Sequence, residues 1–186
     1  MTPSELIAFY RQASPAEVLP KVVEYFSFQP GPPEQGYLTD IHLAFRAELV
    51  EALLSDFSLT DLALIRALFS EEMACEAAIQ RHDNLYQLCF YLYELGQLED
   101  AFRIYEAKFL ARNMDVGMLL DREMMTVRHE VEEVIRYVET VFLYQPELQA
   151  RYPTILQELD ELLTEPDYDS REAYRTFIRG YFYGHV

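Results

Sequence analysis

The amino-acid sequence predicts an all-α protein, a single-domain helical bundle of about seven to nine helices with a central buried helical hairpin. Three observations support this prediction: helix-start signals recur along the chain, strand signals are nearly absent, and apolar residues recur at spacings of three and four. The 186 residues (1–186) suit one domain with one sizeable core. A composition of 51% hydrophobic and 14% aromatic residues argues against a disordered chain.

The N-terminal region contains two matching helix-start signals, TPSE from Thr2 and SPAE from Ser14. Each has a hydroxyl at the N-cap, proline at the first helical position and glutamate at the third, so we expect two short helices. The segment QPGPPEQG at residues 29–36 follows, with three prolines and two glycines. Because these residues cannot continue a helix, we expect a Pro/Gly-rich internal loop.

Further start signals lie beyond this expected loop. Thr39 and Asp40 are expected to cap a helix that runs to Asp56. Serine followed by acidic residues then predicts two short helices, at residues 59–69 and 71–81.

The segment Leu85–Leu95 has apolar residues around almost its whole circumference. This pattern predicts a helix buried at the centre of the fold. Gly96 is expected to end that helix with a positive φ, and residues 98–112 are expected to return as the second helix of a hairpin.

The longest helix is predicted at residues 116–142, where apolar residues alternate steps of four and three, as in a heptad seam. The stripe consists of Val116, Leu120, Met124, Val127, Val131, Val134, Val138 and Val141. After it, Pro146 and Pro153 are expected to start short helical segments, and Asp169–Ser170 to cap a last helix.

The predicted hairpin resembles one tetratricopeptide repeat. Its pattern, Leu85-x-x-Leu88-Cys89-x-x-Leu92-x-x-x-Gly96-x-Leu98-x-x-Ala101-x-x-x-Tyr105, has large, small and glycine positions in matching places. The resemblance implies a helix pair that binds a partner in its groove. However, no second copy lies about 34 residues away on either side, and a repeat array needs about three units. A generic, closely packed helix pair is the alternative.

A longer stretch, residues 85–140, is similar to uncharacterised bacterial helical proteins encoded beside polymorphic toxins. The similarity rests on LYELGQLEDAFRIYEAKF and on MLLDREMMTV further along the chain. Proteins of that kind are suspected immunity proteins. The resemblance therefore implies a protein-binding function, and it brings no catalytic residue to this sequence.

The acidic composition limits the classes of partner. Thirty-two acidic and fifteen basic residues give a formal net charge of −17, which disfavours direct binding to nucleic acid or to anionic lipid. The N-terminus lacks the basic and apolar regions of a secretory signal, and no apolar run reaches the ~18 residues of a membrane span. We therefore expect a cytoplasmic protein that does not enter the membrane.

Patterns for catalysis or metal binding are absent from the sequence, including paired Glu-x-x-His motifs and Gly-rich phosphate loops. His129-Glu130 begins like a zinc-protease helix, but Glu133 stands where the second histidine is required. Cys75 and Cys89 lack the spacing of a zinc site or a disulfide framework, so we expect buried free thiols. The sequence thus predicts a non-enzyme without metal or cofactor.

Acidic residues crowd one part of the sequence, with six between Glu158 and Asp169 and no base among them. Two more acids, Glu130 and Glu133, lie on the predicted long helix at residues 116–142. The candidate partner-binding residues are Glu130, Glu133, Glu158, Asp160, Glu161, Glu165, Asp167 and Asp169. Carboxylates in this number can steer a cationic partner, although a solvated surface that serves solubility alone is the alternative interpretation.

The sequence therefore favours an acidic protein-binding module, an immunity protein that binds and neutralises a basic cognate toxin. The alternative is a helical scaffold or chaperone that binds a peptide or partner protein in the groove of the repeat-like hairpin. An enzyme of unrecognised type is the third, least favoured class. The identity of the partner and the oligomeric state are not predicted.

Overall fold

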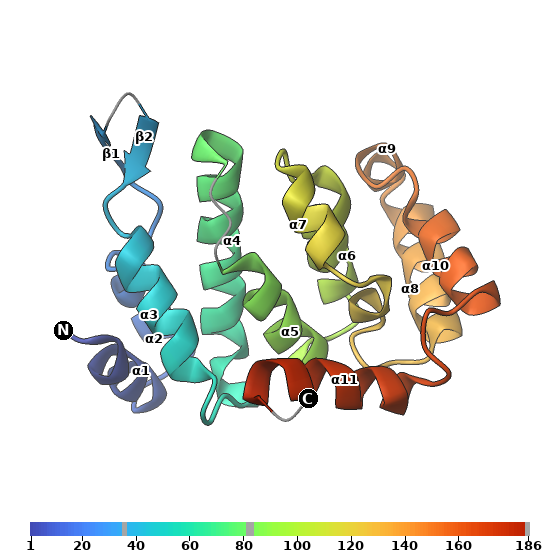
Figure 1. Ribbon diagram of the computed structural model, residues 1–186, viewed down its shortest axis with the longest axis horizontal. Coiled ribbons are helices and arrows are strands. Elements are labelled where there is room, and N and C mark those ends of the chain that lie inside the picture. Colours follow the sequence, from blue (N-terminus) through green and yellow to red (C-terminus); the bar gives the residue numbers. More distant parts are fainter. Residues whose placement is uncertain (35–36, 81–83, 185–186) are drawn as a thin grey trace.

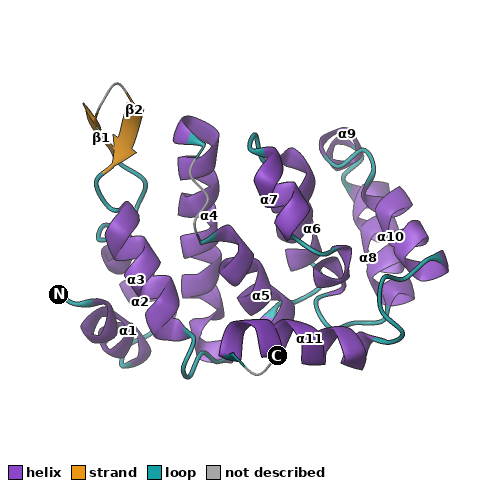
Figure 2. Ribbon diagram, viewed as in Figure 1, coloured by secondary structure: helices purple, strands orange, loops and turns teal. Residues whose placement is uncertain are grey.

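The computed structural model describes residues 1–34, 37–80 and 84–184, which form eleven α-helices and one two-stranded β-hairpin (Figure 1). This confirms the all-α prediction, with more helices than the seven to nine expected. The helices of residues 3–164 stand side by side in a row, and the last helix, α11 (Arg171–Tyr183), runs along the row beneath the lower ends of several of them. Figure 2 shows the β-hairpin projecting at the N-terminal side of the row.

Two short helices, α1 (Pro3–Arg11) and α2 (Pro15–Val23), begin where the sequence predicts them. The Thr2 N–H donates to Glu5 Oε2 at 2.7 Å and the Glu5 N–H donates to Thr2 Oγ1 at 3.3 Å. The predicted capping box is therefore present at α1. Ser14 makes no side-chain cap hydrogen bond, so Pro15 and the acidic Glu17 in the first turn favour the start of α2.

The segment expected to be a loop at residues 29–36 is largely a strand. β1 (Pro30–Glu34) pairs antiparallel with β2 (Tyr37–Asp40), and residues 35–36 lie outside the described part of the chain. Thr39 and Asp40 consequently lie in β2 and do not cap a helix. The helix that follows, α3 (Leu43–Leu53), begins later than predicted and ends before the predicted end at Asp56.

Proline is compatible with β1 because a two-stranded hairpin leaves half of the backbone N–H groups of each strand without a required partner. Gly31 permits the close pairing, since a β-carbon there would lie 2.5 Å from Thr39 Oγ1. The proline-rich segment cannot form a helix, but it forms the edge strand β1 because β2 pairs with it.

α4 (Leu62–Ile79) is one continuous helix where two short helices were predicted, and it is the longest in the described residues. The 3₁₀ helix η1 (Leu59–Asp61) precedes it. Ser70, the expected start of the second helix, instead donates its hydroxyl to Arg66 O at 3.0 Å. Because this bond reaches back one turn, the serine stays inside the helix and caps nothing.

α5 (Leu85–Leu95) has the predicted bounds and is buried on nearly all sides. Gly96 ends it with φ of −65°, so the expectation of a positive φ is wrong. Glycine is needed there for space, because a β-carbon would lie 2.2 Å from Leu92 O. The returning segment is α6 (Asp100–Tyr105) followed by a π-helical turn, η2 (Glu106–Leu110), and it is shorter than predicted.

The predicted long helix at residues 116–142 is wrong. The structure has α7 (Met114–Leu119), the 3₁₀ helix η3 (Arg122–Thr126) and α8 (Val131–Tyr144) in its place. The chain turns at Val127 and Arg128, whose φ values are 42° and 64°.

Burial was nevertheless predicted correctly for most of the apolar stripe. Six of its eight members are at most 2% exposed: Val116, Leu120, Met124, Val127, Val134 and Val138. The spacing of apolar residues indicates which side chains are buried. Several short helices joined by turns can bury the same side chains as one long helix.

The C-terminal helices follow their predicted start signals. α9 (Glu147–Arg151) and α10 (Ile155–Thr164) begin just after Pro146 and Pro153. At α11 the Ala173 N–H donates to Ser170 Oγ at 3.1 Å, so the predicted cap is present.

Glu94, at the end of α5, holds α11 in place. Arg175 donates to both oxygens of the buried Glu94 carboxylate, at 3.0 and 3.2 Å, and Arg179 donates to one of them at 2.9 Å. Phe90 of α5 stacks on Phe182 of α11 with ring centroids 4.5 Å apart. The last helix is therefore fixed across the row by charge and by aromatic packing.

Cys75 and Cys89 are buried free thiols, as predicted. Burial raises the pKa of the Cys75 thiol to about 12 and that of Cys89 further. Both thiols therefore stay protonated near neutral pH, where a protonated buried thiol is unreactive.

Arg46 forms a fully buried charge network at the N-terminal side of the row. Its guanidinium donates to Asp40 Oδ2 at 2.6 Å, to Glu72 Oε2 at 2.7 Å and to Phe26 O at 3.0 Å. Since Asp40 belongs to β2, Arg46 to α3 and Glu72 to α4, the network joins the hairpin to the helices. Burial opposes ionisation of Asp40, but its hydrogen bonds and Arg46 outweigh that effect and lower its pKa.

Arg46→Met should lower the free energy of unfolding by about 3–5 kcal/mol, because it leaves two buried carboxylates without their cation. Urea unfolding followed by circular dichroism measures this change. Arg136→Met, at an exposed position of α8, is the matched control and should change stability by less than about 0.5 kcal/mol. Equal effects of the two substitutions would contradict the importance of the network.

Candidate partner-binding surface

The predicted acidic residues lie on α10, on the segment that joins α10 to α11, and at the start of α8. α8 packs against α10, which brings the two parts of the sequence together. Seven of the eight side chains are exposed: Glu130, Glu133, Asp160, Glu161, Glu165, Asp167 and Asp169. Glu158 is partly buried, and burial raises its pKa.

Arg122 folds onto this acidic stretch from η3. Its guanidinium lies 3.4 Å from Glu161 Oε2 and 3.3 Å from Asp167 Oδ2. Residues 158–169 contain no basic residue. The tertiary structure brings Arg122 to them, although it lies 36 or more positions earlier in the sequence. Exposed pairs of this kind are weak, so the carboxylates keep most of their field.

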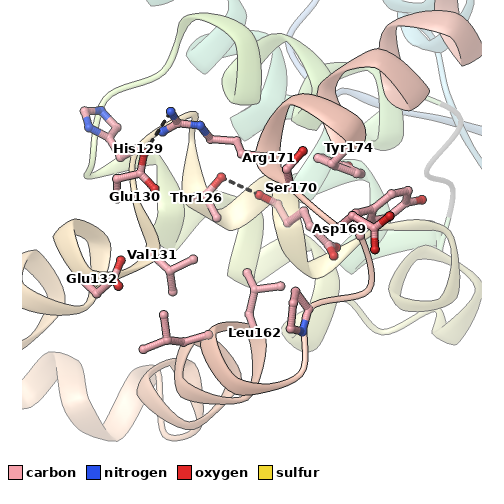
Figure 3. Close-up of a pocket in the computed structure, with 14 residues that line it drawn as sticks. Thr126, His129, Glu130, Val131, Glu132, Leu162, Asp169, Ser170, Arg171 and Tyr174 are labelled. Carbon is pink, nitrogen blue, oxygen red and sulfur yellow. Dashed lines mark hydrogen bonds and ion pairs between the residues drawn. The ribbon is translucent and has the colours of Figure 1, made fainter.

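A pocket of about 250 Å³ lies beside these residues, between the start of α8, the end of α10 and the start of α11 (Figure 3). Apolar groups from all three regions line it: Val131, Leu162, Leu163, Pro166, Tyr168 and Tyr174. In Figure 3, Val131 and Leu162 lie on one side of the pocket, with the ion pair of Glu130 and Arg171 on another. Of the predicted residues, Glu130 and Asp169 line this pocket.

Glu123 is the buried acid of the pocket, with only 7% of its surface exposed. Its Oε1 accepts the Asp167 N–H at 3.2 Å, whereas Oε2 is buried and has no hydrogen-bond partner among the described residues. A buried acceptor left without a donor costs about 1–3 kcal/mol, and more when charged. Burial raises the pKa of Glu123, and the charges of Asp167 and Asp121 raise it further.

A second carboxyl, Asp121, is hydrogen-bonded to Tyr174, one of the residues that line the pocket. The Tyr174 hydroxyl donates to Asp121 Oδ2 at 3.2 Å. Burial raises the pKa of Asp121, while that hydrogen bond and Lys108 partly oppose the shift. Acidic groups are thus present both on the surface and inside this end of the fold.

Arg171 is the cation of the pocket. Its Nη2 lies 3.0 Å from Glu130 Oε1, and its Nη1 donates to Arg128 O at 2.9 Å. These bonds tie the start of α11 to the start of α8. His129, the apparent start of a zinc-protease motif, lies 3.4 Å from Glu133 through Nδ1.

Sequence reasoning missed Glu123, Glu132 and Arg171 as members of this site. Glu123 falls within the predicted long helix at residues 116–142, where the structure has η3 instead, and Arg171 directly follows the predicted cap at Asp169–Ser170. One signal was available: the charged residues Asp121, Arg122 and Glu123 interrupt a mostly apolar stretch from Met118 to Val127, where burying charge is costly.

Comparisons with protein-family models, with curated proteins and with solved structures give no match. The function therefore rests on the chemistry of the chain itself. Among the described residues, no group of His, Cys, Asp and Glu is arranged to hold a metal ion. None of the described helices combines the length and apolar composition needed to cross a bilayer.

Glu123→Gln should stabilise the fold at high pH, because a carboxyl whose pKa is raised by folding destabilises the folded state once it ionises. The variant should melt about 2–4 °C above the parent chain at about pH 8. The difference should shrink as the pH falls through the raised pKa, since the parent carboxyl is then protonated.

Thermal unfolding followed by circular dichroism between about pH 8 and 5 measures this difference. Asp160→Asn removes the same charge from an exposed position and controls for general relief of acidic repulsion. A Glu123→Gln variant that is less stable than the parent at high pH would show that the buried carboxylate is not under strain.

Proposed function

We propose that this chain is an acidic protein-binding module that docks a basic partner protein on the surface formed by α10, residues 165–170 and the start of α8. The single observation that carries the proposal is the exposure of seven predicted carboxylates on these neighbouring elements. In the setting that the sequence resemblance implies, the partner is a basic toxin and the chain is its cytoplasmic immunity protein.

The electrostatic argument follows from the numbers of charges. A chain with a formal net charge of −17 attracts a cationic protein over several ångströms, and a local excess of carboxylates orients the encounter. Such surface charges act mainly on the association rate, whereas buried central contacts set the dissociation rate. We therefore propose that the exposed acids steer the partner towards this surface and that the apolar pocket beside them holds the bound partner.

The alternative, a scaffold that binds a peptide in the groove of the repeat-like hairpin, receives less support. α5 is buried on nearly all sides, with Phe90, Tyr91 and Tyr93 fully covered. Its outer face is occupied by the aromatic side chains of α11. The hairpin therefore serves the core of the protein and offers little surface to a partner.

Replacing Asp160, Glu161 and Glu165 together by lysine should slow association with a basic probe by about tenfold at low salt, because steering is lost. Surface plasmon resonance with a decalysine peptide measures the rate. Raising the salt should slow the parent chain and bring the two rates together.

A second triple variant provides the control. Glu24, Glu48 and Glu51, exposed near or on α2 and α3, are replaced by lysine, which changes the net charge equally at the other side of the row. An equal loss of rate in both variants would mean that total charge alone attracts the probe. Rates that respond neither to salt nor to the first variant would refute the proposal.

A further inference from the structure

The pocket between α8, α10 and α11 has a strongly unbalanced set of charges. Four carboxylates line it, from Glu123, Glu130, Glu132 and Asp169, against the single guanidinium of Arg171. Only Glu130 is paired with that guanidinium, at 3.0 Å. The remaining carboxylates have no ion-pair partner among the residues that the structure describes. An anion would be repelled from such a pocket.

The walls of the pocket add a second requirement. Val131, Leu162 and Tyr174 present apolar surface close to these carboxylates. A ligand that fits both features has an apolar stem and a cationic head. A volume of about 250 Å³ lies below the usual range for drug-sized ligands, so the space suits one side chain better than a cofactor.

Glu123 supplies the independent observation that points to a ligand. It is more than nine-tenths buried, it lines the pocket, and its Oε2 has no donor within the described residues. Buried polar atoms in native structures are almost always hydrogen-bonded. A neutral apolar occupant would leave this oxygen unpartnered, whereas an ammonium or guanidinium group would supply the missing donor.

We propose that this pocket is the anchor site for one lysine or arginine side chain of the basic partner. The alkyl stem lies along Leu162 and Val131, and the cationic head reaches the carboxylate of Glu123 after a small movement of the covering side chains. Lysine and arginine commonly bury their stems on apolar surface in this way. The inference rests on the proposed function, because it assumes that the partner is a basic protein.

Blocked single amino acids test the anchor site without knowledge of the partner. N-acetyl-lysine methylamide, N-acetyl-arginine methylamide and N-acetyl-norleucine methylamide are titrated at constant ionic strength into the full chain labelled with nitrogen-15. The two cationic probes should shift the amide signals of residues 126–132 and 162–171. Norleucine, which keeps the stem and lacks the charge, should shift them little.

Two variants locate the cationic head. Glu123→Gln keeps the acceptor for the Asp167 N–H and removes the charge, so it should weaken binding of the cationic probes by about tenfold. Glu48→Gln removes one charge from an exposed position of α3, outside both the pocket and the acidic surface, and should leave the affinity unchanged within about twofold. Thermal unfolding confirms that both variants fold.

The possible outcomes separate the anchor site from the proposed function. Equal shifts from norleucine, unchanged binding by Glu123→Gln, or no shift from the cationic probes would each overturn the anchor site. If decalysine then still associates in a way that depends on salt and on the α10 carboxylates, docking on the acidic surface survives without an anchor. If both decalysine steering and probe binding fail, the proposed function is wrong as well.

Discussion

The contact between Glu94 and α11 is the interaction on which the candidate site depends. The carboxylate at the end of α5 is almost fully buried and is held by Arg175 and Arg179, while Arg128 donates to the Glu94 carbonyl at 3.0 Å. A buried carboxylate that loses its cations strongly destabilises the fold. Detachment of α11 from Glu94 is therefore unfavourable. Since α11 begins at the pocket, this distant clamp positions Ser170, Arg171 and Tyr174 there.

Arginine has a general role as an internal cross-link in this chain. Ion pairs join arginine to acids from other elements at Arg11, Arg46, Arg66, Arg122, Arg151, Arg171, Arg175 and Arg179. The planar guanidinium suits this role because it donates several hydrogen bonds in a fixed geometry. Because most of the few arginines pair with acids inside the fold, the surplus carboxylates lie unneutralised at the surface. The proposed steering of a partner takes place there.

The acids divide into two physical classes. Those on the surface of α10 are solvated, so they contribute a long-range field and little energy per contact. Glu123 is buried and Asp121 is partly buried, and this burial raises the pKa of both carboxyls because it disfavours their charged form. Carboxyl groups with raised pKa values are found more often at functional sites than elsewhere in proteins. The proposed binding surface uses both classes, with exposed acids at its rim and Glu123 in the proposed anchor pocket.

Local chemistry determined several features from the sequence alone. The capping box at Thr2, the cap at Ser170 and the bounds of α5 depend on neighbouring residues and on side-chain polarity, so they could be predicted. The burial of most of the apolar stripe between Val116 and Val138 was predicted for the same reason. The acidic character of the α10 region was likewise evident from composition.

Only the tertiary structure decided where these parts meet. The β-hairpin requires two strands to pair and Arg46 to reach Asp40 and Glu72, and the turn at Val127–Arg128 allows α8 to pack on α10. Glu123 lines the candidate site because helices distant in sequence pack around it. Hydrogen bonds and ion pairs across 40 or more positions, such as Asp167 N–H to Glu123, leave no local signature in a single sequence.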